Sequence, residues 1–231
     1  MSNVIGIIGA MDIEVNGIVS SMLNVSEKTI SGIKFYSGNL FNKNVVVAKC
    51  GIGKVFAAIC AQTMILEYQP TVIINSGVAG SLTKDLGVLN VAIANNVVQH
   101  DMDTSPLGDP KGLVSGINVI YFDANLNVVN TFVKSAEIQS CKYLCGTIAS
   151  GDKFISAPSE KNALNNEFGA IACEMEGGAI GHACYINNIP FGIIRAISDG
   201  EGAEMDYATF AEKAANQSIE IVKNFVKIYE V

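Results

Sequence analysis

Three carboxylates in this sequence each lie in a run of small and apolar residues, where a protein interior is expected. Glu14 follows the apolar segment "VIGIIGAM", Glu176 closes "ACEME", and Asp199 follows "RAIS". Ionised carboxylates avoid dry interiors unless they are paired or hydrogen-bonded, so three of them in such positions need a reason. Carboxylates held in different environments can divide the roles of acid and base. The pattern therefore predicts acid–base chemistry on a small molecule.

Each of these acids also has an ordinary structural explanation. Glutamates in the first turn of a helix, as predicted for Glu14 and Glu176, are favoured by the helix dipole. Asp199 fits a turn or a helix cap. Three apolar neighbours fit core or rim packing: Met175, Phe154 and Tyr207. The functional interpretation is favoured because each acid comes just past a predicted buried strand, and the carboxyl ends of such strands collect ligands.

Short β-rich runs alternating with helical segments must position these residues. Near-continuous Val and Ile, typical of strands buried on both faces, occur in six runs: 3–8, 44–49, 71–76, 91–98, 169–174 and 190–198. Helical periodicity covers 55–68 and 207–230. The alternation predicts a layered α/β fold with a largely parallel or mixed central sheet, in one domain over residues 1–231.

Composition and motifs exclude several classes of function. The net charge of −7 and the pI near 4.8 argue against binding to nucleic acid or anionic membranes. The six cysteines form no CxxC pair, and the two histidines complete no zinc spacing with them, so reduced thiols in the cytoplasm are expected. The sequence contains no dinucleotide or phosphate-loop fingerprint and no apolar stretch approaching the ~20 residues of a membrane span. The residues alone predict a hydrolase or a transferase without metal or cofactor.

Seven motifs, in order along almost the whole chain, resemble those of 5′-methylthioadenosine/S-adenosylhomocysteine nucleosidases. They are "IGAMDIEV", "KCGIGKV", "VIINSGVAGSL", "HDMD", "SGDKFI", "CEMEGGAIGHAC" and "RAISDG". The resemblance implies a three-layer α/β/α sandwich with a mixed, largely buried central sheet, as in nucleoside phosphorylases. It also implies cleavage of the N-glycosidic bond of adenine thioribosides by water, a step of methionine salvage, in a homodimer without metal or cofactor.

The same resemblance implies a role for each acid. Glu14 matches the general base that activates water, and Asp199 matches the acid that protonates the purine at N7. Asp199 must be protonated when it donates, and the low-dielectric edge of a sheet favours that form. Glu176 matches the carboxylate that binds the ribose hydroxyls. The remaining substrate-binding positions are Gly80, Phe154, Ile155, Met175, Ser198 and Tyr207.

These binding positions divide by the part of the substrate they match. The ring of Phe154 stacks on adenine and the backbone of Ile155 reads its edge, while Met175 packs on the sugar. Tyr207 lines the pocket for the 5′-thio group, and Leu107 closes the neighbouring subunit's site in a C2 dimer.

The chain also departs from the family. Val78 stands where many members have a serine that helps to hold the water, leaving Glu14 and Arg195 for that task. The segment 200–206 is shorter than in some members, and Glu174 is expected in a supporting, hydrogen-bonded role.

Four alternatives remain open at this point. Because Arg195 is the only arginine of the chain, hydrolysis is favoured over phosphorolysis, which needs cationic groups for a phosphate. Aminodeoxyfutalosine and 5′-deoxyadenosine share the adenine and remain possible substrates. A non-catalytic nucleoside-binding protein is the last alternative, although such a protein would not need three acids.

Overall fold

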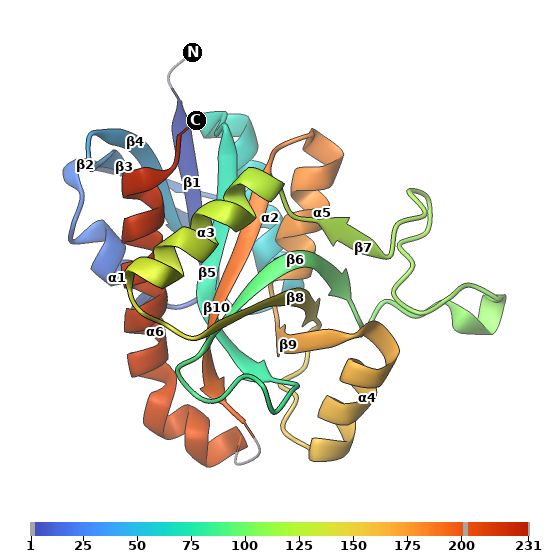
Figure 1. The fold of residues 1–231 in the computed structure, drawn as a ribbon. Coiled ribbons are helices and arrows are strands. Elements are labelled where there is room, and N and C mark those ends of the chain that lie inside the picture. Colours follow the sequence, from blue (N-terminus) through green and yellow to red (C-terminus); the bar gives the residue numbers. More distant parts are fainter. Residues whose placement is uncertain (1–2, 201–202, 231) are drawn as a thin grey trace.

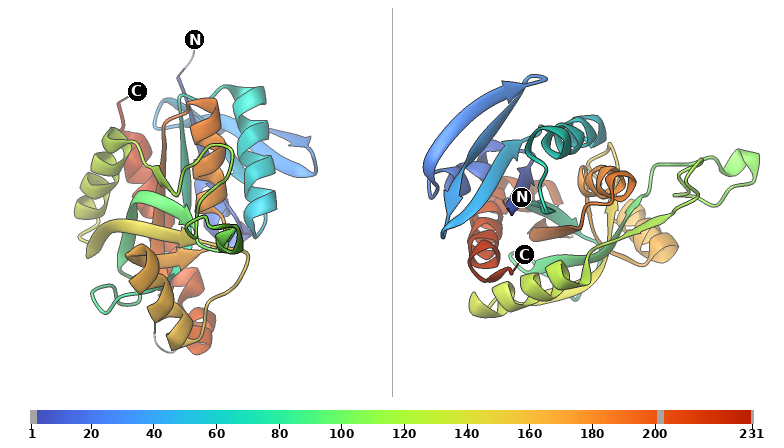
Figure 2. Two further views of the ribbon diagram at one scale, coloured as in Figure 1. Left: turned by 90° about the vertical axis from the view of Figure 1, so that its right-hand side faces the viewer. Right: turned by 90° about the horizontal axis from the view of Figure 1, so that it is seen from above.

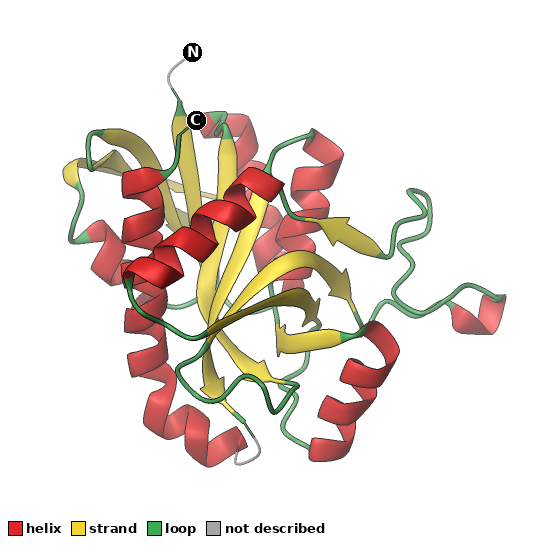
Figure 3. Ribbon diagram, viewed as in Figure 1, coloured by secondary structure: helices red, strands yellow, loops and turns green. Residues whose placement is uncertain are grey.

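A mixed ten-stranded sheet forms the centre of the protein, with helices on both of its faces (Figures 1 and 3). The computed structural model describes residues 3–200 and 203–230. The described strands are β1 (Val4–Gly9), β2 (Leu23–Ile30), β3 (Ile33–Leu40), β4 (Lys43–Lys49), β5 (Val72–Ser81), β6 (Val91–Gln99), β7 (Tyr121–Asp123), β8 (Tyr143–Ser150), β9 (Ala170–Glu174) and β10 (Phe191–Asp199). The described helices are α1 (Asp12–Val19), α2 (Lys54–Tyr68), α3 (Leu126–Ile138), α4 (Pro158–Phe168), α5 (Gly177–Asn187) and α6 (Ala203–Ile228), with a short 3₁₀ turn at Ser105–Leu107.

The sheet closes on itself at one end and stays open at the other. Its strands follow the order β10-β6-β8-β9-β5-β1-β4-β3-β2, with β7 paired to β6. Strand β10 also pairs with β5 in parallel, so these two strands, β6, β8 and β9 form a ring. The open end is the β2–β3 hairpin, and the β2 residues are nearly all exposed, whereas β10 is buried throughout.

Two apolar cores lie on opposite faces of the sheet, as expected for three layers. One core packs α2 and α5 against the sheet through residues such as Met64 and Ile180. The other packs α1, α3 and α6 against the opposite face, with Ile18, Phe132 and Phe225 fully buried. The predicted three-layer α/β/α fold is therefore confirmed.

A long connection between β6 and β7 extends away from the body of the protein (Figure 2). It carries the Ser105–Leu107 turn, and the Leu107 side chain is 83% exposed. No helix in the described part of the chain is long and apolar enough to cross a membrane. All six cysteines lie in that part, and all are free thiols.

Candidate active site

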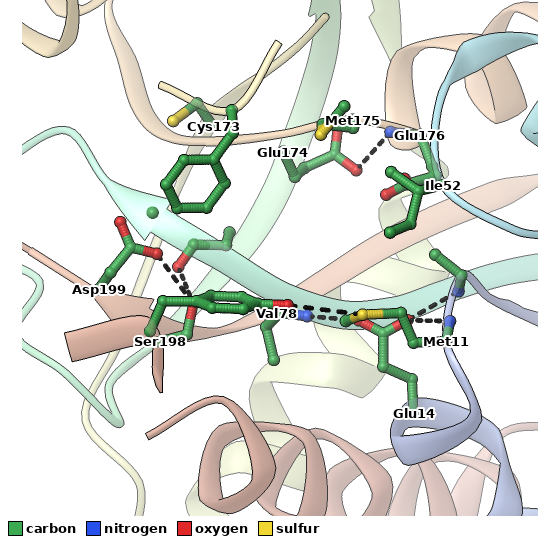
Figure 4. Close-up of a pocket in the computed structure, with 15 residues that line it drawn as sticks. Met11, Glu14, Ile52, Val78, Cys173, Glu174, Met175, Glu176, Ser198 and Asp199 are labelled. Carbon is green, nitrogen blue, oxygen red and sulfur yellow. Dashed lines mark hydrogen bonds between the residues drawn. The ribbon is translucent and has the colours of Figure 1, made fainter. Parts of the chain in front are cut away.

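A cavity lies where β1, β5, β9 and β10 reach their carboxyl ends (Figure 4). Its walls are formed by Ala10, Met11, Glu14, Ile52, Val78, Ala79, Gly80, Phe154, Cys173, Glu174, Met175, Glu176, Ser198, Asp199 and Tyr207. Eight of the nine site residues predicted from the sequence are in this set. The ninth, Ile155, lines a smaller adjoining cavity together with Phe154 and Asp199. The structure therefore brings the predicted residues together.

Glu14 lies at the third position of α1, immediately after β1. Its Oε2 accepts hydrogen bonds from the N–H groups of Ala10 (2.7 Å) and Met11 (3.0 Å), and its Oε1 accepts one from Val78 (3.1 Å). The side chain is buried, and this burial raises the pKa of Glu14 although Arg195 and the three N–H groups oppose the rise. The carboxylate is thus fixed in direction but poorly solvated, which suits a proton acceptor.

Arg195 is the cation of this end of the cavity and is fully buried. Its Nη2 donates to Glu174 Oε2 and Asn75 Oδ1 and lies 3.5 Å from Glu176 Oε2. Among the described residues, its Nε and Nη1 have no acceptor. A Cβ at Gly77 would lie within 2.2 Å of Nη1 and 2.5 Å of Glu14 Oε1, so only glycine leaves room for both groups.

Glu174 organises the junction between β9 and α5. Its carboxylate accepts hydrogen bonds from the N–H groups of Glu176 (3.0 Å) and Gly177 (2.8 Å), and from Ser150 Oγ. Together with the ion pair to Arg195, these contacts fill its oxygens with protein partners. This geometry agrees with the supporting role expected for Glu174.

Glu176 occupies the position just before α5 and is 5% exposed. Its Oε1 accepts from the N–H of Gly53 at 3.0 Å, at the start of α2. Burial, aided by the negative charge of Glu174 and opposed by Arg195, raises the pKa of Glu176 to about 7. Glu176 therefore has fewer hydrogen-bond partners than Glu174 and remains available to a ligand.

Asp199 ends β10 on the other side of the cavity and is buried, as expected. Its Oδ1 accepts from Ser198 Oγ at 2.9 Å. Its Oδ2 lies 3.0 Å from Nζ of Lys161, a residue of α4 that the sequence analysis did not select. Asp199 therefore does not stand alone at the dry edge of the sheet, because a buried lysine lies beside it. The sequence offers no signal for Lys161, which resembles any lysine of a polar helix.

Aromatic and apolar side chains complete the cavity. The rings of Phe154 and Tyr207 meet edge to face with centroids 5.6 Å apart, and Phe154 is 46% exposed. Tyr207 also contacts Met11 through its hydroxyl, 3.5 Å from Sδ. Burial and the negative charges of Glu14 and Asp199 raise the pKa of Tyr207. Within the shorter segment 200–206, residues 201–202 lie outside the described residues.

The described residues contain no group of three or more His, Cys, Asp or Glu side chains that could hold a metal ion. The charged groups of the cavity are buried carboxylates, with two buried cations beside them. At one end stand Glu14, Glu174 and Glu176 around Arg195, and at the other end Asp199 stands with Lys161.

Comparison with known proteins agrees with the fold and the cavity. The family model described as phosphorylase superfamily matches residues 4–227. The 5′-methylthioadenosine/S-adenosylhomocysteine nucleosidase of Staphylococcus aureus (strain JH9) is 38% identical over 226 residues, covering 96% of this chain and 98% of that one.

Solved structures give the same result. A mutant of the Helicobacter pylori methylthioadenosine nucleosidase, with 5′-methylthioadenosine in its active site, matches with a TM-score of 0.93 and 34% identity over 98% of this chain and 99% of that one. The native futalosine hydrolase of Helicobacter pylori strain 26695 matches with the same TM-score and identity, over 98% of both chains.

These matches make the chain a member of the phosphorylase superfamily. The likeness over nearly the full length of both chains places it, within that superfamily, in the 5′-methylthioadenosine/S-adenosylhomocysteine nucleosidase family. The resemblance seen in the sequence motifs is confirmed.

Proposed function

We propose that this protein hydrolyses the N-glycosidic bond of 5′-methylthioadenosine and S-adenosylhomocysteine, releasing adenine and the thioribose. The observation that carries the proposal is the convergence of three buried acids, Glu14, Glu176 and Asp199, on one cavity that also has an exposed aromatic ring. Cleavage passes through a ribosyl cation, so the site must supply a proton to the base and negative charge to the sugar. The two ends of the cavity match these two requirements.

At one end, Asp199 is the general acid for N7 of adenine. Gly80 lies against it, and a Cβ there would come within 2.8 Å of Asp199 Oδ2, so glycine leaves room for the carboxylate. Phe154 stacks on the purine, the backbone of Ile155 binds its edge, and Ser198 orients the carboxylate by its hydrogen bond. A positioned general acid contributes roughly 10²–10⁴-fold to such a step.

At the other end, Glu14 and Arg195 hold and activate the water. Glu14 is fixed by three backbone N–H groups, and Arg195 has N–H groups at Nη1 and Nε that no described residue accepts. Because residue 77 is a glycine, Glu14 Oε1 and Arg195 Nη1 both have room beside it. The backbone of Val78 contacts Glu14, so the valine side chain does not remove this part of the site.

Glu176 binds the ribose hydroxyls, and Met175 packs on the sugar. Because burial raises the pKa of Glu176 to about 7, the carboxyl is partly protonated near neutral pH in the free protein. Hydroxyl donors from the sugar favour the carboxylate, so substrate binding and ionisation of Glu176 support each other. The anion then stabilises the ribosyl cation.

Hydrolysis is favoured over phosphorolysis by the surroundings of Arg195, the only arginine of the sequence. Arg195 is fully buried among three carboxylates, which would repel a phosphate dianion, whereas its N–H groups that no described residue accepts can still donate to a neutral water. We expect cleavage of methylthioadenosine at the same rate in phosphate-free buffer, with free methylthioribose as product. A strict phosphate requirement with a sugar 1-phosphate product would refute hydrolysis, and binding without adenine release over hours would indicate a non-catalytic binder.

A second substrate is favoured by one comparison. The futalosine hydrolase of Helicobacter pylori is as similar in fold as the methylthioadenosine nucleosidase, so aminodeoxyfutalosine remains a candidate substrate. The adenine end would serve both, whereas the 5′ end near Tyr207, Met11 and Ile52 would discriminate. Turnover of methylthioadenosine, S-adenosylhomocysteine, 5′-deoxyadenosine and aminodeoxyfutalosine measured in parallel decides among them.

A C2 homodimer completes the proposal. Helix α2, which packs beside α5, exposes an apolar stripe in which Val55 is 70%, Phe56 is 55% and Leu66 is 67% exposed. Such patches mark interfaces, and the exposed Leu107, on the protruding connection, would contact a neighbouring copy in this dimer. Light scattering at micromolar concentration is expected to give a dimer mass, and a fully active monomer would contradict it.

Free thiols in all six cysteines support a cytoplasmic location.

A further inference from the structure

One buried cation touches the carboxylate assigned to N7 protonation. Lys161 is 6% exposed, and its Nζ donates to Asp199 Oδ2 at 3.0 Å and to the carbonyl oxygen of Gly200 at 2.6 Å. It comes from α4, which is not part of the sheet edge that holds the other acids. The side chains of the pair are 8% and 2% exposed, so water screens their charges little.

This contact offers two groups, Lys161 and Asp199, that can hold the proton to be donated to adenine. The two side chains form a buried ion pair in which Nζ of Lys161 is the donor and Oδ2 of Asp199 is the acceptor, 3.0 Å apart. Lysine, unlike arginine, can release its proton inside a protein. The pair therefore contains one mobile proton, bound at Nζ while the cavity is empty of substrate.

We propose that Lys161 is the positioning residue that supplies Asp199 with the proton it donates to N7. The step rests on the function proposed above. The Nζ–H bond of Lys161 breaks as an O–H bond forms on Asp199, and Asp199 passes a proton to N7 while the electron pair of the glycosidic bond moves to the base.

The protons balance over the reaction. Lys161 is left neutral and regains a proton from solvent, and the attacking water loses a proton to Glu14, which returns it to solvent. A surface cavity lined by Lys161, Asn162, Gly200 and the segment 81–88 gives Lys161 a side from which water can reach it.

Few other groups compete for this proton. The titratable groups facing the pair are Cys173 from β9 and Tyr207 from α6, and Lys84 shares the surface cavity with Lys161. Burial raises the pKa of Cys173 to about 12, and burial also raises the pKa of Tyr207. Neither group takes up or releases a proton at neutral pH.

The test is the pH dependence of kcat/KM for Lys161→Met, which keeps the length of the side chain and removes the ammonium. On methylthioadenosine the wild-type profile should rise between about pH 6 and pH 8 as Glu176 ionises, so the variant is compared with the wild type at each pH. Relative to the wild type at the same pH, kcat/KM of the variant should be about 10²-fold lower near pH 8, and this ratio should recover as the pH falls, because Asp199 then takes its proton from solvent in place of Lys161. Lys134→Met, an exposed lysine of α3, is the control and should match the wild type.

A second substrate separates this role from a structural one. A nitrophenyl methylthioriboside has a leaving group that needs no protonation, so Lys161→Met should stay within about threefold of the wild type on it at every pH. An unchanged pH profile on methylthioadenosine, or equal losses on both substrates, would overturn the proposal. Should the methionine variant not fold, Lys161→Gln is read in the same way. Inactivity of the wild type on every adenine nucleoside would overturn the proposed function itself, and this inference with it.

Discussion

The two ends of the cavity pair carboxylates with cations in different ways. At the end proposed to bind adenine, called the base end, Asp199 has a single cationic partner, Lys161, which comes from a helix outside the sheet. At the end proposed to bind ribose, called the sugar end, Arg195 extends from the fully buried strand β10 and faces Glu14, Glu174 and Glu176 together. The first cluster is balanced in charge, whereas the second has more carboxylates than cations.

The difference matters because the two cations have different chemistry. A guanidinium stays charged under all ordinary conditions, so Arg195 is a fixed charge that orders carboxylates and cannot deliver a proton. A lysine can gain and lose a proton, so the base end can change its charge during a reaction. Burial, aided by the charge of Glu174, raises the pKa of Glu176 at the sugar end, and the excess of carboxylates there favours a cation placed beside them. The comparison assigns proton donation to one end and charge stabilisation to the other.

Removing the fixed charge should have the largest effect. Arg195→Met leaves three buried carboxylates without their cation, which is expected to lower the free energy of unfolding by about 3–5 kcal/mol. Urea denaturation of the variant beside Lys134→Met measures this loss. A decrease below about 1 kcal/mol would show that the carboxylates do not depend on Arg195.

The next largest effect is expected for Glu14, the carboxylate proposed to activate the water. Glu14→Gln is expected to reduce kcat on methylthioadenosine by about 10²–10⁴-fold, because the amide cannot accept the proton of water. Affinity for an adenine-containing inhibitor should be retained better than in Phe154→Ala, which removes the stacking ring. Calorimetric titration of both variants tests this, and equal loss of affinity would contradict the assignment.

Glu176→Gln should show a smaller loss in kcat/KM, about 10-fold to 10²-fold, with KM also raised, because the carboxylate touches the sugar in ground and transition states. Its stability should depend on pH. Since the pKa of Glu176 is raised to about 7, the folded wild type binds more protons than the unfolded chain between pH 4.5 and 7 and loses stability as the pH rises through that range. The variant lacks this loss.

The measurement is therefore the melting temperature at pH 5 and at pH 8. The value for Glu176→Gln minus that for the wild type should increase from the lower pH to the higher one. Glu212→Gln, an exposed residue of α6, is the control and should show no such increase. If the difference in melting temperature between Glu176→Gln and the wild type were the same at both pH values, burial would not raise the pKa of Glu176 in the folded protein.

The smallest effect is expected for Val78→Ser. The contact of residue 78 with Glu14 is made by its backbone N–H, which the substitution keeps. Steady-state kinetics on methylthioadenosine should therefore stay within about threefold of the wild type. A larger gain would show that the missing hydroxyl limits how the water is held.

Much of the fold was predictable because its central strands are apolar on both faces. The runs 44–49, 71–76 and 190–198 all became buried strands, with boundaries shifted by a few residues. Strands β2 and β3 were not predicted, since polar residues such as those of "NVSEKT" give no such run and β2 is exposed on the open edge. Helix α4 was also missed, because it is polar and packs on the ring of strands through few residues.

The candidate site likewise contains residues that the sequence predicts and residues that it does not. Acids that follow buried strands are visible in a sequence, and Glu14, Glu176 and Asp199 do line one cavity. Lys161 was not visible, because a lysine in a polar helix is normally exposed and only the tertiary fold brings its Nζ to Asp199. Sequence patterns thus indicate which carboxylates are buried, whereas the cations that set their charge depend on contacts between distant segments.

The division of labour between the two ends is tested most directly by Asp199→Asn on two leaving groups. On methylthioadenosine, kcat should fall by about 10²–10⁴-fold, since the amide can donate a hydrogen bond to N7 but no proton. On a nitrophenyl methylthioriboside, the same variant should come within about tenfold of the wild type, while Glu14→Gln should remain inactive on both substrates. Equal losses for the two variants on the activated substrate would contradict the account, as would near-normal activity of Asp199→Asn on methylthioadenosine.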